Sequence, residues 1–275
     1  NALTSFRFIA ALFVFIHHVG LWSQYKTGYL GVSFFFILSG FILAFNYNNK
    51  LLKLDSIEIR KFYIARLSKI YPIHVITFFL AIPYYFFIPL QHKPILYIFQ
   101  GFSNLFLIHS FIPFGNISYN GVSWSLSDEG LFYILFPYLL FLVLKYFSSI
   151  SRMIFIISCL WIIFVLSFWF YLPLNNELSE WFAYFFPGTR VFEFFVGIIL
   201  GLIFIRLEDW FRNFSFLFFS LFEIGSILLL FLVVVLSLDI NQNLRYGLVY
   251  IPFWSFIIYI FAFQKGVISK ILTNY

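Results

Sequence analysis

The sequence predicts an all-α fold, a polytopic bundle of about eight or nine transmembrane helices with one re-entrant segment. Two features predict it. Of the 275 residues, 63% are hydrophobic and only 10% are charged, whereas a soluble domain carries about 25% charged residues. Apolar runs long enough to cross a bilayer also recur from one end of the chain to the other. A soluble fold of this size could not bury so much apolar surface, so we expect the chain to lie in a membrane.

Eight apolar runs have the roughly 17 to 25 residues that a ~30 Å hydrocarbon core requires. In chain order they are Phe6–Trp22, Tyr29–Tyr47, Tyr71–Leu90, Leu126–Leu144, Met153–Pro173, Pro187–Ile205, Phe214–Leu238 and Tyr246–Phe263. Neither a Ser/Gly-rich linker nor a polar domain separates them. We therefore expect a single transmembrane domain over residues 1–275.

The segment Ile95–Ile112 is apolar overall but carries several polar side chains. If it enters and leaves the bilayer on one side, most basic residues outside the spans share the side of the Asn1 end, and the exceptions are Lys26, Lys93 and Arg245. A full span here would move the basic residues of the C-terminal half to the outer side. The positive-inside rule thus favours a re-entrant segment, with the N-terminus and the basic connector Lys50–Lys69 cytoplasmic.

Charge and cysteine content exclude several classes of function. The net charge of +6 does not indicate a nucleic-acid partner, because the basic residues sit in short connectors rather than in a recognition module. Cys159 is the single cysteine and lies inside an apolar run, so it forms no intrachain disulfide. No ligand spacing typical of a metal site occurs, and we predict no metal.

Arg7 and two histidines, His17 and His18, fall in the first apolar run, where ionisable side chains are costly and often functional. Arg7 and His18 lie eleven residues apart. Eleven helical steps place them within about 20° of one face and about 16 Å apart along the axis. This suits an anionic cofactor gripped by Arg7, with His18 as a general base. The spacing equally allows Arg7 to reach the headgroups and His18 to bond a neighbouring helix.

The segment Ser123–Tyr133 gathers polar and aromatic side chains where a span begins. Ser125 or Ser127 is a suitable N-cap, with Asp128 and Glu129 in the first helical turn. Capping accounts for Asp128 better than for Glu129, because the residues one turn after Glu129 are aromatic. We expect Glu129 to have a raised pKa or a cationic partner.

Three further charged residues lie within predicted spans. Arg190 and Glu193 have the i,i+3 spacing of a compensating ion pair. Glu223 either pairs with another helix or faces a cavity.

Four segments resemble the membrane-bound acyltransferase-3 family. Phe6–His18 resembles its motif of Arg, ten residues and His, and Tyr29–Phe41 resembles its second-span signature. Arg66–Pro72 is similar to the basic motif before its third span, and Trp124–Tyr133 to its Trp-Ser-Leu-Ser-x-Glu-x-x-Phe-Tyr segment. Arg190–Gly197 adds weaker support. All of these occur in the family's order.

The resemblance implies an integral-membrane acyltransferase that moves an acyl group, usually acetyl from acetyl-CoA, to a hydroxyl of a cell-surface polysaccharide or related glycan or lipid acceptor. Its partners would be membrane lipids, acyl-CoA and the glycan, and its location the bacterial inner membrane. The resemblance assigns His18 and Glu129 to catalysis, and Arg7, Arg66 and Lys69 to the acyl-CoA co-substrate, the last two at its phosphates. It assigns four residues to the acceptor, namely Trp124, Ser127, Tyr133 and Arg190.

The chain departs from the family pattern at three places. Lys69 stands where the family more often has Arg, which keeps the charge but loses the bidentate fork. Ser33 stands where many members have Asp. The family normally continues through at least one more span after the position of Tyr275, so we expect the last span to be missing from this sequence.

Two other functions compete with acyl transfer. A transporter or flippase of a lipid-linked glycan often shows internal repeats with paired broken helices, and the sequence shows no such repeat. A non-catalytic membrane scaffold has little reason to place Arg7, His18 and Glu129 in apolar surroundings. Acyl-CoA turnover that depends on His18 would separate an enzyme from both.

Overall fold

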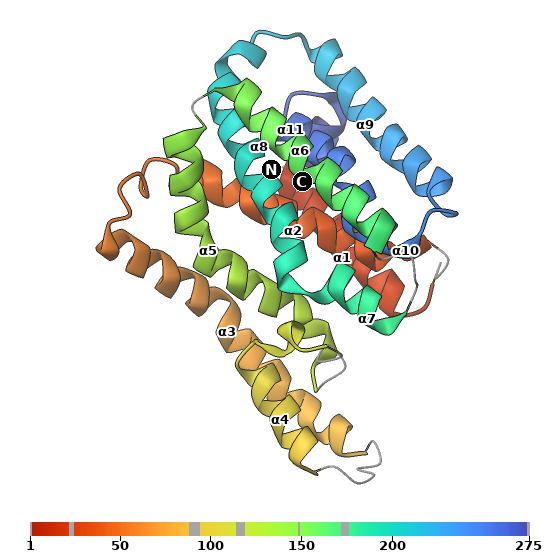
Figure 1. Ribbon diagram of the computed structural model, residues 1–275. Helices are drawn as coiled ribbons and strands as arrows, with labels where there is room; N and C mark the ends of the chain where they lie inside the picture. Colours follow the sequence, from red (N-terminus) through yellow and green to blue (C-terminus); the bar gives the residue numbers. More distant parts are fainter. Residues whose placement is uncertain are drawn as a thin grey trace. The chain divides into compact units, whose positions relative to one another are not determined.

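The computed structural model describes residues 2–21, 25–87, 94–113, 119–147, 149–171 and 176–273. Every regular element in these ranges is a helix, which confirms the all-α prediction (Figure 1). The chain forms two compact units. The first comprises Asn1–Asn48, Tyr146–Pro173 and Phe192–Tyr275, and the second comprises Asn49–Lys145 and Leu174–Val191. Compact units can belong to one domain, so the single transmembrane domain stays a prediction.

The first unit is built on two long helices whose backbones touch. Its elements are α1 (Ala2–His18), α2 (Thr27–Tyr47), α6 (Ile150–Tyr171), most of α8 (Pro187–Phe211), α9 (Phe216–Leu236), α10 (Gln242–Leu244), the π-helical turn η5 (Arg245–Val249), α11 (Ile251–Ala262) and α12 (Val267–Thr273). A Cβ on Gly40 of α2 would lie 2.1 Å from the carbonyl oxygen of Phe194, and one on Gly197 of α8 would lie 2.0 Å from that of Ile37. Glycine is therefore required on both helices, as in close membrane-helix pairs.

Around this pair, α1 packs on α2, α11 and α12, and α11 packs on α2 and α9. The buried side chains of α1 are Ala2, Leu3, Phe6 and Ala10, which recur at helical spacing and form the face that meets these neighbours.

The second unit contains α3 (Ser56–Phe87), α4 (Pro94–Leu105), the 3-10 turns η2 (His109–Phe111) and η3 (Gly121–Ser123), α5 (Trp124–Tyr146), α7 (Glu177–Glu180) and the π-helical turn η4 (Trp181–Phe185). Helices α3 and α4 lie side by side (Figure 1). Tyr63 of α3 also donates a hydrogen bond to the carbonyl oxygen of Ile134 on α5, at 3.0 Å.

Among the described residues, six helical segments are long and apolar enough to cross a membrane: Thr27–Tyr47, Ser56–Pro83, Gly121–Tyr146, Ile150–Tyr171, Phe216–Leu236 and Gln242–Ala262. Ala2–His18 is apolar but shorter, and the predicted span Pro187–Ile205 lies within α8. The predicted span ends at Trp22, Leu90 and Pro173 lie outside the described residues. A total of about eight or nine spans, and a missing last one, stay predictions.

Two connectors differ from simple loops. The predicted basic connector Lys50–Lys69 is mostly helical, because α3 begins at Ser56. Lys, Arg and Ala favour helix as strongly as apolar residues do, so hydropathy marks only the apolar part of this helix. The predicted segment Ile95–Ile112 overlaps α4, whose 12 residues extend about 18 Å, which is short of a ~30 Å hydrocarbon core. Its re-entrant placement stays a prediction.

Candidate active site

The second unit has an open cavity of about 450 Å³. Its walls come from α3, from α5 and from the turn that follows α4. Most of the lining is apolar, and the polar or charged residues are Tyr63, Arg66, Tyr71, Ser127 and Tyr133. A cavity of this size with a few polar groups is typical of a small-molecule site.

Three residues predicted from the sequence line this cavity: Arg66 from α3, and Ser127 and Tyr133 from α5. Glu129 joins them indirectly, because the Tyr133 hydroxyl donates to its Oε2 at 2.7 Å. This bond follows from the helix, since Glu129 and Tyr133 are one turn apart. The Arg66 guanidinium lies 5.7 Å from the centroid of the Phe62 ring. The cavity thus combines a cation with an acid–phenol pair in apolar surroundings.

The turn after α4 forms a wall with an unusual backbone. Leu107 has a φ of 56°, the left-handed region that a branched side chain rarely adopts. Ser127 Oγ donates to the Leu107 carbonyl oxygen at 2.5 Å, and Ser110 Oγ donates to Ser127 Oγ at 2.7 Å. These bonds hold the strained turn against α5, as is common beside functional sites.

The predicted capping role of Ser125 or Ser127 is wrong. Helix α5 begins at Trp124, directly after η3, and its first turn contains no acidic residue. Ser127 lies inside the helix and bonds the turn after α4 instead. The reason is that Gly121–Ser123 already curls into a 3-10 turn, which starts the helix earlier than the polar run suggests.

Two fully buried histidines, which the sequence analysis did not place in the site, support the cavity wall. His74 Nε2 donates to the Asn104 carbonyl oxygen at 3.0 Å, and His109 Nε2 lies 3.3 Å from Ser123 Oγ. Burial, and after it the neighbouring His74, lowers the pKa of His109 to about 4. The available signal was His74 itself, an ionisable residue within a predicted span.

The remaining predicted residues of this unit lie outside the cavity lining. Lys69 is exposed on α3, three residues beyond Arg66. Trp124 packs on Tyr184, with ring centroids 4.9 Å apart. Arg190, only 1% exposed, places its guanidinium 4.7 Å from the same Tyr184 ring. Trp124 and Arg190 therefore share one aromatic partner, Tyr184 of η4.

Arg7 and His18 belong to the first unit, and both lie in α1 as predicted. His18 is exposed, and its Nδ1 lies 2.8 Å from the Val14 carbonyl oxygen. Because a carbonyl only accepts, Nδ1 carries the hydrogen and the neutral ring keeps its lone pair on Nε2. His17 instead packs on Tyr29, with ring centroids 5.4 Å apart.

Glu223 pairs with another helix, the first of the two alternatives. Its fully buried carboxylate accepts hydrogen bonds from the backbone N–H groups of Gly266 at 2.9 Å, Ile268 at 2.9 Å and Ser269 at 3.0 Å, and from Ser269 Oγ at 2.5 Å. It thus caps the N-terminus of α12 with the charge that a helix N-terminus favours.

Within the described ranges, no three His, Cys, Asp or Glu side chains gather in an arrangement that could hold a metal ion. Cys159 is a half-buried free thiol.

Comparison with known proteins identifies the family. A model of the acyltransferase domain matches residues 1–273. The chain is 32% identical to acyltransferase MdmB of Streptomyces mycarofaciens over 237 residues, which cover 76% of this chain and 58% of the relative. It is 26% identical to peptidoglycan O-acetyltransferase OatA of Listeria monocytogenes over 217 residues, 74% of this chain and 33% of the relative. The chain therefore spans well under two thirds of either protein. No solved structure matches it.

Proposed function

The chain belongs to the family whose acyltransferase domain matches residues 1–273, and from that membership we propose that it is a membrane-embedded acyltransferase using acyl-CoA. The acyl group is acetyl, and the acceptor is a hydroxyl of a cell-surface polysaccharide or a related glycan or lipid. One relative, a peptidoglycan O-acetyltransferase, supports both choices.

The observation that carries this proposal is the cavity of the second unit. Acyl-CoA combines an apolar acyl and thioester end with anionic phosphates, and the cavity combines an apolar lining with the cation Arg66. We place the acyl end inside, with Arg66 at the phosphates because a guanidinium can grip two oxygens at once. Lys69, exposed on the same helix, holds the phosphates that remain outside.

In the reaction, the acceptor hydroxyl loses its proton to a base while its oxygen bonds to the thioester carbonyl carbon. The carbon–sulfur bond breaks, and CoA leaves as a thiolate that takes up a proton. We assign the base to His18, whose Nε2 keeps its lone pair while Nδ1 donates to Val14. Arg7 is assigned to a CoA phosphate.

We assign Glu129 to catalysis through the Tyr133 hydroxyl, which it orients by accepting its hydrogen. Ser127 and Tyr133, which line the cavity, contact the acceptor. Trp124 and Arg190 help to position the acceptor through the Tyr184 ring, which both of them contact. The enzyme resides in the bacterial inner membrane with a cytoplasmic N-terminus, where acyl-CoA is available.

A glycan transporter or flippase is the weaker alternative, because the matching family is one of acyltransferases. The two functions differ in whether acyl-CoA is consumed. We would reconstitute the full-length protein in nanodiscs with radiolabelled acetyl-CoA and compare it with His18→Ala. We expect the variant to lose CoA release and label transfer with an unchanged melting temperature. Equal turnover in both proteins would remove His18 from the mechanism.

A second experiment tests the cavity itself with two glycines. A Cβ added at Gly130, which lines the cavity, meets nothing within 4 Å, and the same holds for Gly225 of α9, which lines no cavity described above. Gly130→Leu should fill the cavity and raise the KM for acetyl-CoA by about tenfold or more. Gly225→Leu is the matched control and should leave the KM unchanged. An unchanged KM in Gly130→Leu would move the donor site elsewhere.

A further inference from the structure

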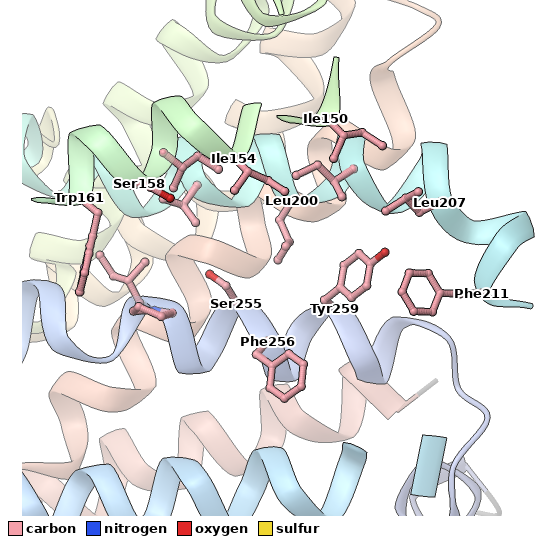
Figure 2. Close-up of a pocket in the computed structure, with 15 residues that line it drawn as sticks. Ile150, Ile154, Ser158, Trp161, Leu200, Leu207, Phe211, Ser255, Phe256 and Tyr259 are labelled. Carbon is pink, nitrogen blue, oxygen red and sulfur yellow. The ribbon is translucent and has the colours of Figure 1, made fainter. Parts of the chain in front are cut away.

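The first unit holds a second cavity, of about 420 Å³, between α6, α8 and α11 (Figure 2). None of its lining residues is charged, and the lining is apolar except for Ser158, Ser255 and the ring-bound hydroxyl of Tyr259. Ile154 on α6 and Pro252 on α11 both line it and are exposed, so the cavity reaches the surface. Trp161 closes one end, and its Nε1 donates to the Leu248 carbonyl oxygen at 3.0 Å.

Two residues of α11 with hydroxyl groups, Ser255 and Tyr259, line this cavity. Figure 2 shows Ser255 and Tyr259 on the side of α11 that faces α8. Ser255 Oγ and Tyr259 Oη are buried from solvent, and neither has a hydrogen-bond partner among the described residues. They lie one turn apart, about 6 Å along the helix. The Tyr259 ring is held in place by Phe211 and Phe263, with ring centroids 5.8 Å and 5.5 Å away.

Ser255 differs from other helical serines in this protein. Ser103, Ser220 and Ser226 each donate their hydroxyl hydrogen to a backbone carbonyl three or four residues earlier. A serine hydroxyl within a helix usually forms its hydrogen bond in this way. Ser255 does not form this bond. A buried hydroxyl without a partner costs about 1–3 kcal/mol, so two such groups facing one cavity point to a ligand that accepts their hydrogens.

The position of the hydroxyls suggests the depth of that ligand. The candidate span Gln242–Ala262 contains both residues. Tyr259 lies about 4.5 Å, and Ser255 about 10 Å, from the end of this span at Ala262. Polar headgroup regions flank the ~30 Å core on each side, so the two hydroxyls lie near one interface and the rest of the cavity runs toward the core.

The uncharged lining and the two hydroxyl groups indicate which class of lipid fits this cavity. Helix α6 is a candidate span that is only 11% buried, so lipid chains reach the cavity. An isoprenoid chain has no hydrogen-bond acceptor along its length. A phosphate at the hydroxyls would need a cation, and no lining residue supplies one. Ester carbonyls are neutral acceptors, and they lie at the interface next to a hydrocarbon chain.

We propose that this cavity binds one acyl chain of a membrane glycerolipid, whose ester carbonyls accept hydrogen bonds from Ser255 Oγ and Tyr259 Oη. This site is independent of the acyl-donor cavity, since it belongs to the other unit and lacks a charged residue. It assigns a lipid to a cavity of α6, α8 and α11 whose lining contains none of the residues proposed for acyl transfer.

The test compares two lipids that differ only in the carbonyls. The full-length protein is delipidated in detergent, and its melting temperature is measured with diester phosphatidylglycerol or with the diether lipid of identical chains and headgroup. We expect the diester lipid to raise the melting temperature by about 2–4 °C more than the diether lipid. The double variant Ser255→Ala/Tyr259→Phe should respond equally to both. Without lipid it should melt no lower than wild type, because it loses no hydrogen bond.

The matched control is another serine–tyrosine pair of the same unit. Ser237 and Tyr250 bond each other at 2.9 Å, so Ser237→Ala/Tyr250→Phe should lower the melting temperature yet keep the preference for the diester lipid. An equal response of wild type to both lipids, or a preference that survives in Ser255→Ala/Tyr259→Phe, would overturn the proposal.

Occupancy is tested separately with a phosphatidylglycerol that carries a diazirine in one acyl chain. Photolysis should label peptides of α6 and α11, and the cavity-filling variant Leu200→Trp should reduce that label about tenfold. Label that is unchanged in Leu200→Trp would place the lipid elsewhere and overturn the site.

Discussion

The two units each place a glutamate within a predicted span, but they surround it differently. Glu223 of the first unit is fully buried, and its carboxylate accepts three backbone N–H groups and one hydroxyl of α12. Glu129 of the second unit is half-buried and bonds Tyr133, which lines a cavity of about 450 Å³. The Glu223 carboxylate is fully surrounded by protein. The Glu129 carboxylate is next to a cavity that a ligand can occupy.

This difference refines the rule that ionisable residues inside a membrane are functional. Glu223 satisfies the N–H groups that a buried helix terminus would otherwise leave without partners. Its presence is explained by structure alone. Glu129 bonds a phenol on its own helix, and that bond leaves a hydroxyl at the cavity wall. The useful distinction is whether backbone N–H groups take up the hydrogen-bonding capacity of the carboxylate, or whether the carboxylate orients another side chain at a cavity.

The largest expected effect is on turnover. Glu129→Gln keeps the size of the side chain but removes the charge that orients the Tyr133 hydroxyl, so acetyl transfer should fall by about 10²-fold or more. Glu223→Gln is the matched variant and should keep the turnover of the folded enzyme. Both are measured as CoA release per folded molecule. Full turnover in Glu129→Gln would erase the functional contrast between the two glutamates.

Acid should weaken the second unit through His109. Its folded pKa of about 4 lies below the unfolded value of about 6.5. Between these values the unfolded chain binds a proton that the folded chain does not, so stability falls as the pH drops from about 6.5 to 4. The total loss is about 3 kcal/mol. Hydrogen exchange at His109 and η3 should report it. His109→Gln should remove this pH dependence, and a pH dependence that persists would assign it to another group.

Glu223→Gln should destabilise the first unit by about 2 kcal/mol, because an amide supplies one oxygen where the carboxylate supplies two. Denaturation in detergent would measure this. Asp239→Asn, an exposed acid of the same unit, is the control and should change stability by less than about 0.5 kcal/mol. If Glu223→Gln leaves the free energy of unfolding unchanged, α12 is held in place without the Glu223 cap.

The last comparison tests how closely Glu223 fits against Gly266. A Cβ on Gly266 would lie 2.3 Å from Glu223 Cδ, so Gly266→Ala should cost about 1–3 kcal/mol. Gly225→Ala, in open space on α9, should be neutral or stabilising by up to about 1 kcal/mol. Thermal melting of the two variants compares them directly. Equal melting temperatures would mean that the carboxylate can move aside.

Part of the candidate site was predictable because it depends on local spacing. Glu129 and Tyr133 meet one turn apart on α5, beside the cavity that Tyr133 lines. The turn that completes the cavity was not predictable. The left-handed Leu107 is held by Ser127, twenty residues later in the chain. The polar run around Ser127 suggested a helix cap, and only the fold shows that its hydroxyl bonds elsewhere.

The sequence by itself determined that this protein is a helical membrane protein of an acyltransferase family, because hydropathy, helical period and motif order are properties of consecutive residues. The tertiary structure decided which polar groups bond each other, which of them face a cavity, and which serve packing. Glu223 and Gly266 are 43 residues apart, as are Thr77 and Asn120, and no spacing rule connects them. The physical reason is that a buried polar group takes whichever partner the packing of helices brings within about 3 Å.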